Sequence, residues 1–268
     1  MSIYLGAGST AHKMSKLYVG VSGQARQVQK VYVGVGGQAR LVYYQSGKPI
    51  GGLAVGSIVK IKVNGASKDF IVVQQGNPNT STYDSSCNGT WLLMKDIYTT
   101  SIFGSSNSYK DSGIHTYLNG TFYSLIDSDI RNAIKQVKIP YQNGTGSGGS
   151  LVTGSNGLST KVFLLSGYEV GWTTSYSRYF PNDGVRLTYF KNGSGGNSKR
   201  VAYNGSSAAF WWLRSSHTNG SRYVWCVYTD GSDTSFLCNG SFSSSIGVRP
   251  ALILPSTTLV DESGNVIG

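Results

Sequence analysis

Residues 211–215 read Trp-Trp-Leu-Arg-Ser, and residues 247–252 read Gly-Val-Arg-Pro-Ala-Leu. The first is a dense apolar run, which is typical of a buried strand. An alternative interpretation makes its two tryptophans platforms on which sugar rings stack. We expect both Arg214 and Arg249 to be buried beside a carboxylate, because an isolated buried charge is costly, and Glu169 is a candidate partner. Binding of a ligand anion is the alternative.

Strand patterns spread outward from these two stretches. Extended, apolar-rich runs predict strands at 57–63 and 69–75 (around the turn Asn64-Gly65), 90–94, 161–165, 210–214, 222–229, 234–238 and 247–254. The spacing of apolar residues is helical only between Ile114 and Lys135. There we expect Asn119-Gly120 to interrupt one helix, and Asp127 or Ser128 to cap a second.

Residues 173–207 show little periodicity and are expected to be mostly loop. Two helices, several short antiparallel strands and long loops predict an α+β domain over residues 51–268. Seven Asn-Gly-Ser/Thr triplets in this region are interpreted as tight turns, since Asn-Gly supplies the positive φ angles that hairpins need.

The N-terminal segment is organised differently, as an internal repeat. The sequence of residues 16–29, KLYVGVSGQARQVQ, recurs as KVYVGVGGQARLVY at residues 30–43. In each copy an alternating apolar run precedes a Ser-Gly or Gly-Gly turn and a second extended run, which predicts a β-hairpin. Such hairpins expose their edges, so we expect residues 1–48 to form an all-β anchor that associates with a neighbour or with other copies of the chain, and Lys48–Gly52 to be a linker.

The chain carries a formal net charge of +11, but its basic residues are scattered and form no run typical of a nucleic-acid-binding arm. One asymmetry is local, because residues 1–50 contain six lysines and arginines and no carboxylate. This segment should prefer an acidic neighbour, either another protein subunit or an anionic polymer. We expect no nucleic-acid partner.

No apolar stretch is long enough to span a bilayer, and the first residues do not resemble a signal peptide. We therefore expect neither membrane insertion nor export, and interpret Cys87, Cys226 and Cys238 as reduced, packed thiols. Proximity of Cys226 and Cys238 across a turn, in a redox or copper-binding pair, is the alternative.

The sequence contains no phosphate-binding loop, dinucleotide fingerprint or nucleophile elbow. Its three histidines are far apart, and neither Asn77-Pro78-Asn79 nor Pro181-Asn182-Asp183 offers enough carboxylates for a calcium loop, so both are interpreted as turns. We expect a protein without catalytic residues, bound metal or cofactor.

The pair WWLRS and GVRPAL, together with Val162-Phe163-Leu164-Leu165-Ser166 and Glu169, resembles the closing signature of a phage-associated domain family of unknown function. That resemblance implies a C-type-lectin-like fold of the formylglycine-generating-enzyme type over residues 51–255. The Tyr-Val-Gly-Val repeat resembles short modules in tail and minor structural proteins of phages that infect Firmicutes. Together they imply a virion protein, assembled in the bacterial cytoplasm, in which a ligand-binding head stands on a structural base and is sometimes diversified in sequence.

Aromatic and short polar side chains between the two signatures have the chemistry of adaptable binding surfaces and of sugar recognition. The predicted ligand-binding residues are His217, Asn219, Arg222, Tyr223, Trp225, Tyr228, Asp230, Asp233, Phe236, Asn239 and Phe242. Strict alternation would place Tyr223, Trp225 and Val227 on one face of their strand and Arg222, Val224, Cys226 and Tyr228 on the other, so only one set should be exposed.

The leading hypothesis is a phage adhesin that binds a host-surface glycan or protein, joins other virion proteins through residues 1–48, and forms a homo-oligomer, with a trimer suggested by analogy with tail fibres. A decoration or tail-assembly protein that binds no host ligand is the second hypothesis. An enzyme acting on a thiol or a sugar is the third.

Overall fold

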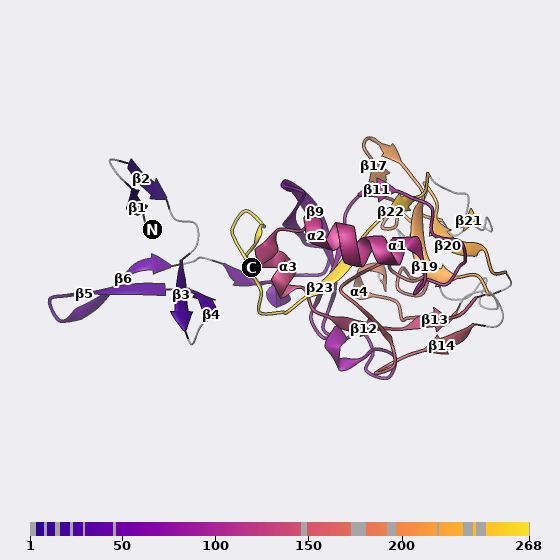
Figure 1. Ribbon diagram of the computed structural model, residues 1–268, viewed down its shortest axis with the longest axis horizontal. Coiled ribbons are helices and arrows are strands. Elements are labelled where there is room, and N and C mark those ends of the chain that lie inside the picture. Colours follow the sequence, from indigo (N-terminus) through magenta and orange to yellow (C-terminus); the bar gives the residue numbers. More distant parts are fainter. Residues whose placement is uncertain are drawn as a thin grey trace. The chain divides into compact units, whose positions relative to one another are not determined.

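The computed structural model describes residues 4–7, 10–13, 17–21, 24–28, 30–44, 47–145, 149–172, 181–191, 197–218, 220–232, 238–239 and 245–267. The chain divides into two compact units, Met1–Gly47 and Lys48–Gly268, called unit 1 and unit 2 below (Figure 1). Each unit is described by itself.

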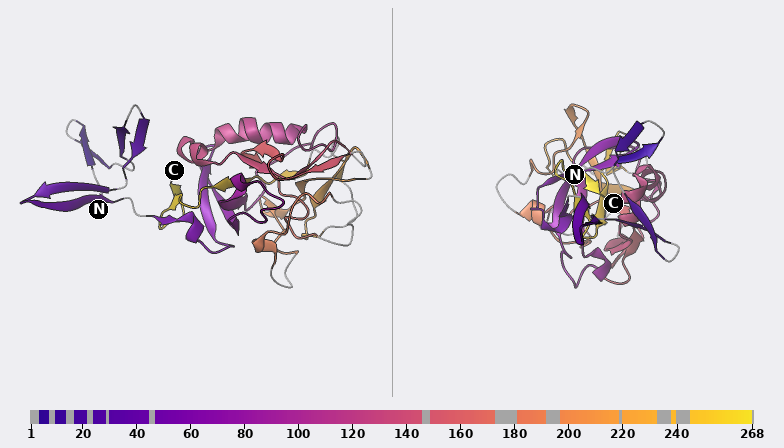
Figure 2. Two further views of the ribbon diagram at one scale, coloured as in Figure 1. Left: turned by 90° about the horizontal axis from the view of Figure 1, so that it is seen from below. Right: turned by 90° about the vertical axis from the view of Figure 1, so that its left-hand side faces the viewer.

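Unit 1 consists of two-stranded antiparallel hairpins, seen as short ribbons in Figure 2. Their strands are β1 (Tyr4–Ala7) with β2 (Thr10–Lys13), β3 (Tyr18–Val21) with β4 (Gln24–Gln27), and β5 (Lys30–Val35) with β6 (Gln38–Tyr44). The two hairpins predicted from the repeat are confirmed. In the third, Gly36 and Gly37 take φ angles of 61° and 78°, the left-handed conformation that a tight hairpin turn requires.

The first hairpin, β1–β2, is a diverged copy that the repeat analysis missed. In the three hairpins Gly6 pairs with Ala11, Gly20 with Ala25, and Gly34 with Ala39. A tyrosine stands two residues before each of these glycines, at positions 4, 18 and 32. The period is 14 residues throughout, so unit 1 contains three copies of one hairpin in a common register.

Unit 2 is built around two five-stranded sheets. The first runs in the order β16-β23-β10-β9-β8, and the second in the order β11-β22-β19-β20-β21. The strands of the first sheet are β8 (Ile58–Val63), β9 (Ala66–Gln75), β10 (Thr90–Met94), β16 (Val162–Phe163) and β23 (Ala251–Leu254). Those of the second are β11 (Thr99–Thr100), β19 (Trp211–Ser216), β20 (Tyr223–Val227), β21 (Cys238–Asn239) and β22 (Gly247–Val248).

The first sheet forms the core of unit 2. Its edge strand β8 alternates exposed and buried residues, as a half-buried strand should, whereas every residue of β10 and β23 is buried. Strands β8 and β9 meet at Asn64-Gly65, where both φ angles are positive, as the sequence predicted. The Trp91 ring packs edge-on against Tyr83 and Phe163.

The WWLRS stretch and the first two residues of the GVRPAL stretch lie side by side in the second sheet. Trp211 pairs with Gly247 in parallel, and all of β19 is buried, which confirms the buried-strand interpretation of the tryptophan run. The chain then leaves this sheet after Val248 and enters the first sheet at Ala251. Residues 249–250 are therefore a crossover from one sheet to the other.

Short strands complete the unit: β7 (Lys48–Pro49), β12 (Val137–Ile139), β13 (Tyr141–Asn143), β14 (Ser150–Val152), β15 (Leu158–Thr160), β17 (Tyr203–Asn204), β18 (Ser207–Ala208), β24 (Leu259–Val260) and β25 (Val266–Ile267). The helical segments are η1 (Ile50–Gly52), η2 (Ser85–Cys87), α1 (Gly113–Tyr117), η3 (Leu118–Phe122), α2 (Tyr123–Leu125), α3 (Ser128–Ala133) and α4 (Thr188–Lys191). None of the helices in the described ranges has the length and hydropathy that a membrane crossing requires.

The predicted break at Asn119-Gly120 is wrong. Segments α1, η3 and α2 follow one another without interruption, and the chain passes Gly120 as a π-helical turn. Asn119 is fixed there because its Nδ2 donates to the carbonyl oxygens of His115 and Val162. The predicted cap of the next helix is confirmed, since the Asp127 side chain accepts from the Asp129 amide, but that helix, α3, has only six residues.

The predicted α+β, C-type-lectin-like fold with two helices is wrong. Strands account for 38% of the structure and helix for 14%, and only one helix reaches 13 residues. Short antiparallel pairs that the sequence pattern did not predict also form: β12–β15, β13–β14 and, at the end of the region expected to be loop, β17–β18. Strands of two or three residues are too short to produce a readable alternation, so the sequence pattern could not reveal them.

The segment Lys48–Gly52 is not a free linker. Pro49 pairs with Leu259 and Lys48 with Val260, and the Ile50 side chain is fully buried. A Cβ on Gly51 would approach the Ser256 Cβ to 2.6 Å, so a glycine is required for this close contact. The beginning of unit 2 is thus held against its C-terminal strands.

Candidate functional site

Of the predicted ligand-binding residues, Asn219, Asp233, Phe236 and Phe242 lie outside the described residues. Three others are exposed: Arg222, Tyr223 and Asp230. Tyr228 and Asn239 are half-buried, and His217 and Trp225 are buried. Some of the predicted ligand-binding residues therefore lie on the surface, and others are part of the core beneath it.

The exposed and half-buried residues fall into two groups at opposite ends of β20. Tyr223 pairs with Asn239 on the edge strand β21, and Arg222 precedes it; these three residues are called the recognition edge below. Tyr228 and Asp230 follow the other end of β20, about 16 Å away at 3.3 Å per residue. There the Tyr228 ring packs edge-on against Phe210, with 4.6 Å between centroids.

The expected alternation along β20 is wrong. Val224, Trp225, Cys226 and Val227 are all buried, because β20 is an inner strand of its sheet and both of its faces are covered. The Trp225 ring lies 5.5 Å from His217 and 6.4 Å from Trp172. Trp225 and His217 are therefore part of the packed core next to the recognition edge and not part of the exposed surface.

A buried asparagine fixes the turn that carries the recognition edge. The Nδ2 of Asn107 lies 3.0, 2.6 and 3.0 Å from the carbonyl oxygens of His217, Gly220 and Tyr223. Its backbone N–H donates to the carbonyl of Ser221. Asn107 is fully buried, and the sequence analysis missed it because a single asparagine among serines carries no signal of a contact more than a hundred residues away.

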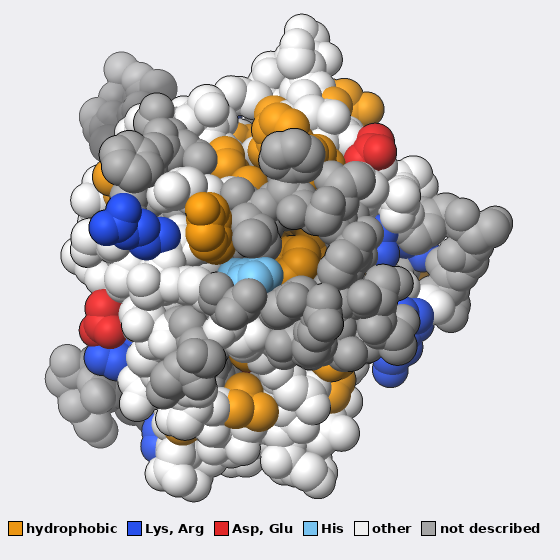
Figure 3. All heavy atoms as spheres, turned by 90° about the vertical axis from the view of Figure 1, so that its right-hand side faces the viewer, with side chains coloured by type: hydrophobic (Ala, Val, Ile, Leu, Met, Phe, Trp, Pro, Cys, Tyr) orange, Lys and Arg blue, Asp and Glu red, His pale blue; other side chains and the backbone are white. Residues whose placement is uncertain are grey.

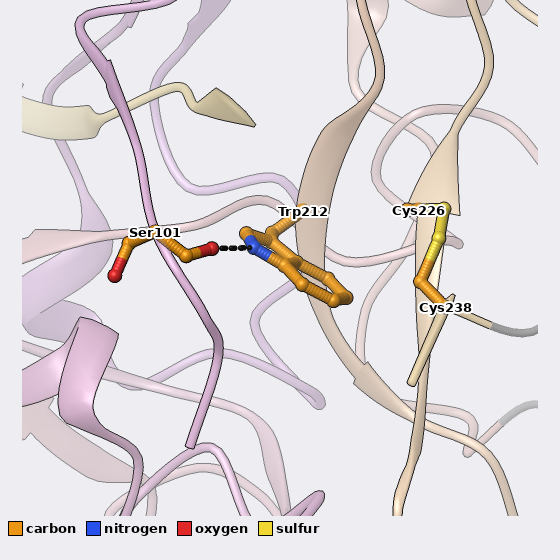
Figure 4. The surroundings of a disulfide bond; sticks show 4 residues. All are labelled: Ser101, Trp212, Cys226 and Cys238. Atoms are coloured by element: carbon orange, nitrogen blue, oxygen red, sulfur yellow. Dashed lines mark hydrogen bonds between the residues drawn. A yellow bond between two sulfur atoms is a disulfide. The ribbon is translucent and has the colours of Figure 1, made fainter. Parts of the chain in front are cut away.

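Cys226 and Cys238 form a disulfide, so the prediction of reduced thiols is wrong for this pair (Figure 4). Their Cα atoms are 6.2 Å apart, within the range that a disulfide spans. Cys226 pairs across the sheet with Trp212, whose indole Nε1 donates to the Ser101 carbonyl at 2.8 Å. The disulfide therefore ties the edge strand β21 to the inner strand β20. The strand on the other side of β20, β19, is itself held by the hydrogen bond from Trp212 to Ser101.

Cys87 is the remaining cysteine and is unbonded and buried. Burial raises the pKa of its thiol to about 12, and the nearby Glu169 carboxylate acts in the same direction. Because a thiol with this pKa stays protonated at neutral pH, Cys87 is a poor nucleophile. Neither it nor the bonded pair supports the thiol version of the enzyme hypothesis.

Behind β19 lies a buried ion pair, as predicted for Arg214 and Glu169. The guanidinium Nη1 and Nη2 donate to the Glu169 carboxylate at 2.6 and 2.7 Å. The other N–H groups donate to the carbonyl oxygens of Pro140, Leu164 and Asp183. All five guanidinium donors thus have acceptors, which is the condition under which a charge can be buried.

The Glu169 carboxylate also accepts from the Tyr83 hydroxyl at 2.8 Å and from the Ser166 amide at 2.9 Å. The Tyr83 hydroxyl in turn accepts from the Val185 amide. Burial, followed by the charge of Glu169, raises the pKa of Tyr83 well above its usual value. Tyr83 therefore remains a neutral hydrogen-bond donor to this ion pair.

Asp183 brings a second carboxyl group to the same arginine and is fully buried. Both of its carboxylate oxygens lie about 3 Å from the Ser215 hydroxyl, at 3.0 and 2.9 Å. Burial raises the pKa of Asp183 to about 7, although Arg214 and Ser215 oppose this shift. The Arg214 guanidinium binds the backbone carbonyl of Asp183, whereas the Asp183 carboxylate has the neutral Ser215 hydroxyl as its partner, so burial dominates and this carboxyl group accepts a proton readily.

Arg249 is also buried, but the predicted carboxylate partner is wrong for it. Its Nε and Nη2 donate to the carbonyl oxygens of Met94 and Lys95, each at 2.8 Å, and its guanidinium lies 4.8 Å from the centre of the Trp211 ring. Burial lowers the pKa of Arg249 to about 10. The group remains charged at neutral pH and fixes the crossover between the two sheets.

Figure 3 looks at unit 2 from the side on which Figure 1 places β20 and β21. On this face separate hydrophobic side chains and one histidine are visible, while lysine, arginine and acidic side chains lie toward its rim. Within the described ranges, no group of three or more His, Cys, Asp or Glu side chains is placed to hold a metal ion.

Comparison with known proteins gives one match. Residues 88–256 match the family described as a domain of unknown function (DUF6273), and the chain belongs to this family. No curated protein and no solved structure matches the chain.

The disulfide predicts a thiol count. Under denaturing conditions a thiol reagent should detect one thiol per chain before reduction and three after it, because only Cys87 is free. Reduction should lower the free energy of unfolding by about 3 kcal/mol, since the bond closes a loop of about a dozen residues. The variant Cys87→Ala is the control and should give zero and two thiols; three thiols in the unreduced native sequence would contradict the pairing.

Breaking the buried ion pair should be strongly destabilising. In Glu169→Gln, the Arg214 charge remains buried without its carboxylate, so urea unfolding should show a loss of about 3–5 kcal/mol. The matched control is Asp69→Asn at the exposed Lys95–Asp69 pair, 3.9 Å apart, which should cost less than about 1 kcal/mol. Similar losses in the two variants would show that the buried pair has no special role.

Asp183 predicts a pH dependence of stability. An aspartate in the unfolded chain titrates near pH 4, below the pKa of about 7 in the fold. Between these values the folded state binds the extra proton, so stability should fall as pH rises from about 4 to 7, by up to about 1.4 kcal/mol per pH unit.

Asp183→Asn cannot ionise and should lack this slope. Urea unfolding of both proteins at pH 4.5, 6.0 and 7.5 isolates the contribution of this carboxyl, because the other titrating groups cancel in the difference. A difference between the two proteins that stays constant with pH would refute the shifted pKa.

Proposed function

We propose that this member of the DUF6273 family is a receptor-binding protein of a bacteriophage particle. In this proposal the recognition edge, Arg222, Tyr223 and Asn239, contacts a glycan or protein on the surface of the host cell. Unit 1 attaches the chain to other virion proteins. The observation that carries the proposal is the exposure of Arg222 and Tyr223 at the end of a strand whose other residues are sealed in the core.

The chemistry of the recognition edge supports binding. A tyrosine ring stacks on the apolar face of a sugar or packs into a protein surface at low cost in conformational entropy. Arginine supplies planar hydrogen-bond donors that suit carboxylate and phosphate groups, and asparagine supplies both a donor and an acceptor. This combination suits recognition better than catalysis, for which an activated nucleophile or a base would be needed.

The rigidity beneath the recognition edge also supports binding. Asn107 fixes the turn before β20, the disulfide fixes β21, and Arg214 fixes β19. A surface that is already ordered loses less entropy when a ligand binds. Binding residues on such a rigid base are typical of recognition proteins.

The location on a phage particle rests on the resemblance of the N-terminal repeat and of the WWLRS and GVRPAL stretches to phage proteins. The disulfide is compatible with it, since such bonds persist outside the reducing cytoplasm and a released particle is outside the cell. The exposed apolar residues of unit 1, including Tyr32 and Val33, are compatible with attachment to another protein.

The proposal predicts binding to host surfaces that depends on the recognition edge. The fluorescently labelled full chain, applied to a panel of Firmicutes cells and their purified cell walls, should bind at least one member, and EDTA should not abolish binding. The double variant Arg222→Ser with Tyr223→Ala should weaken that binding roughly tenfold or more, since an exposed ring and a charge are removed from the centre of the contact.

The matched control is Tyr203→Ala, which removes a tyrosine of similar exposure, 46% against 39%, from the β17–β18 hairpin. This variant should bind as the native chain does. Equal losses in both variants would place the contact elsewhere. If no cell or wall preparation bound the chain, and particles lacking it adsorbed normally, the protein would be a structural component that recognises no host ligand.

A further inference from the structure

Among the side chains of unit 1 that the structure describes, none of the apolar ones is buried. Adjacent residues of β5 point to opposite faces of the hairpin, yet Tyr32 and Val33 are 53% and 45% exposed. Val35, also on β5, and Val19 on β3 are each 49% exposed. Both faces of β5 are therefore open, and a two-stranded hairpin is marginally stable in water by itself.

The positive charge of unit 1 indicates which kind of surface can bind over its exposed apolar residues. Residues 1–47 hold five of the 23 lysines and arginines of the chain and none of its 12 acidic residues. A second copy of unit 1 would bring +5 against +5. Unit 2 is no better suited, because the chain as a whole carries +11 and unit 2 therefore retains +6. A covering surface should instead be acidic.

An anionic polymer would satisfy the charges but would leave the valines and the tyrosine ring in water. The hairpins also have outer strand edges, whose backbone N–H and C=O groups form a continuous row of hydrogen bonds only when another polypeptide strand pairs with them. A protein with acidic residues around an apolar strand satisfies all three requirements.

The three hairpins share one backbone register with period 14, in which Gly6, Gly20 and Gly34 pair with Ala11, Ala25 and Ala39. Each can therefore offer the same backbone edge to a partner. Three weak contacts on one chain act together, because the second and third form at a high effective concentration once the first has formed.

We infer that unit 1 consists of three equivalent docking modules, each of which pairs a strand edge with an acidic, apolar-centred β-strand of another protein. This inference deepens the attachment role in the proposed function and does not depend on recognition of a host ligand. The partner therefore presents several such strands, as a protein present in many copies would.

A synthetic peptide of alternating valine and glutamate serves as the probe of this surface. By fluorescence anisotropy it should bind the full chain with a stoichiometry of three, and binding should weaken as salt rises. The variant Arg26→Glu with Arg40→Glu should lower the stoichiometry from three to about one, because it reverses the charge of two hairpins and leaves the β1–β2 hairpin, with His12 at the equivalent position, unchanged. The matched control, Lys60→Glu with Lys62→Glu on exposed positions of β8, should change binding less than twofold.

Three further probes test the occupant: a valine–lysine peptide, polyglutamate, and the valine–glutamate peptide with alternate backbone nitrogens methylated. None should bind comparably. Polyglutamate that bound as well would identify an anionic polymer as the occupant, and an unimpaired methylated peptide would exclude strand pairing. Failure of the valine–glutamate peptide to bind, or self-association in sedimentation that the Arg26/Arg40 reversal abolishes, would also overturn the inference.

The failure of this inference and that of the proposed function are distinguishable. The variant Arg222→Ser with Tyr223→Ala should leave peptide binding unchanged, and the Arg26/Arg40 reversal should leave cell-wall binding unchanged, because the two surfaces belong to different units.

Discussion

Two buried arginines hold the two sheets of unit 2 together. Arg214 extends from β19 in the second sheet to the carbonyl of Leu164, just after β16 in the first. Arg249 stands where the chain crosses between the sheets and bonds to the carbonyls of Met94 and Lys95, at the end of β10. Each guanidinium thus replaces the strand-to-strand hydrogen bonds that are interrupted where one sheet gives way to the other.

The two buried guanidinium charges are stabilised by different groups. Arg214 has a full set of acceptors including a carboxylate, whereas Arg249 has backbone carbonyls and the face of Trp211. A carbonyl dipole and an aromatic ring stabilise a cation less than a carboxylate does. This difference explains why burial lowers the pKa of Arg249 while the pKa of Arg214, next to Glu169, is raised despite its burial.

Local patterns predicted what depends on neighbours in the sequence. The Asn64-Gly65 turn, strand β10, the repeat hairpins and the Asp127 cap all follow from residues within a few positions of one another. The buried Arg214–Glu169 pair was predictable for another reason: a guanidinium within an apolar strand needs an acceptor, and the chain has only 12 carboxylates to supply one.

Contacts between distant segments were not predictable in this way. The alternation along β20 was misleading, because a strand reads as half-exposed unless one knows that both of its faces are covered. The disulfide depends on β21 pairing beside β20, and the roles of Asn107 and Asp183 depend on segments more than thirty residues away. The fold class failed for the same reason, since hairpins of two or three residues are stabilised by packing and not by their own sequence.

The recognition edge follows from these constraints. On β20, burial begins immediately after Tyr223, because the next residue enters the covered part of the sheet. The turn before it is held by a buried side chain, and the strand beside it by a covalent bond. The exposed side chains can therefore differ between related chains without disturbing the core, because none of the contacts that hold the scaffold passes through them. Unit 1 shows the opposite arrangement: its hairpins repeat one backbone register, while Val19, Tyr32, Val33 and Val35 are exposed. One chain thus combines a unit stabilised by its own buried contacts with a unit whose described apolar side chains on β3 and β5 are largely open to solvent.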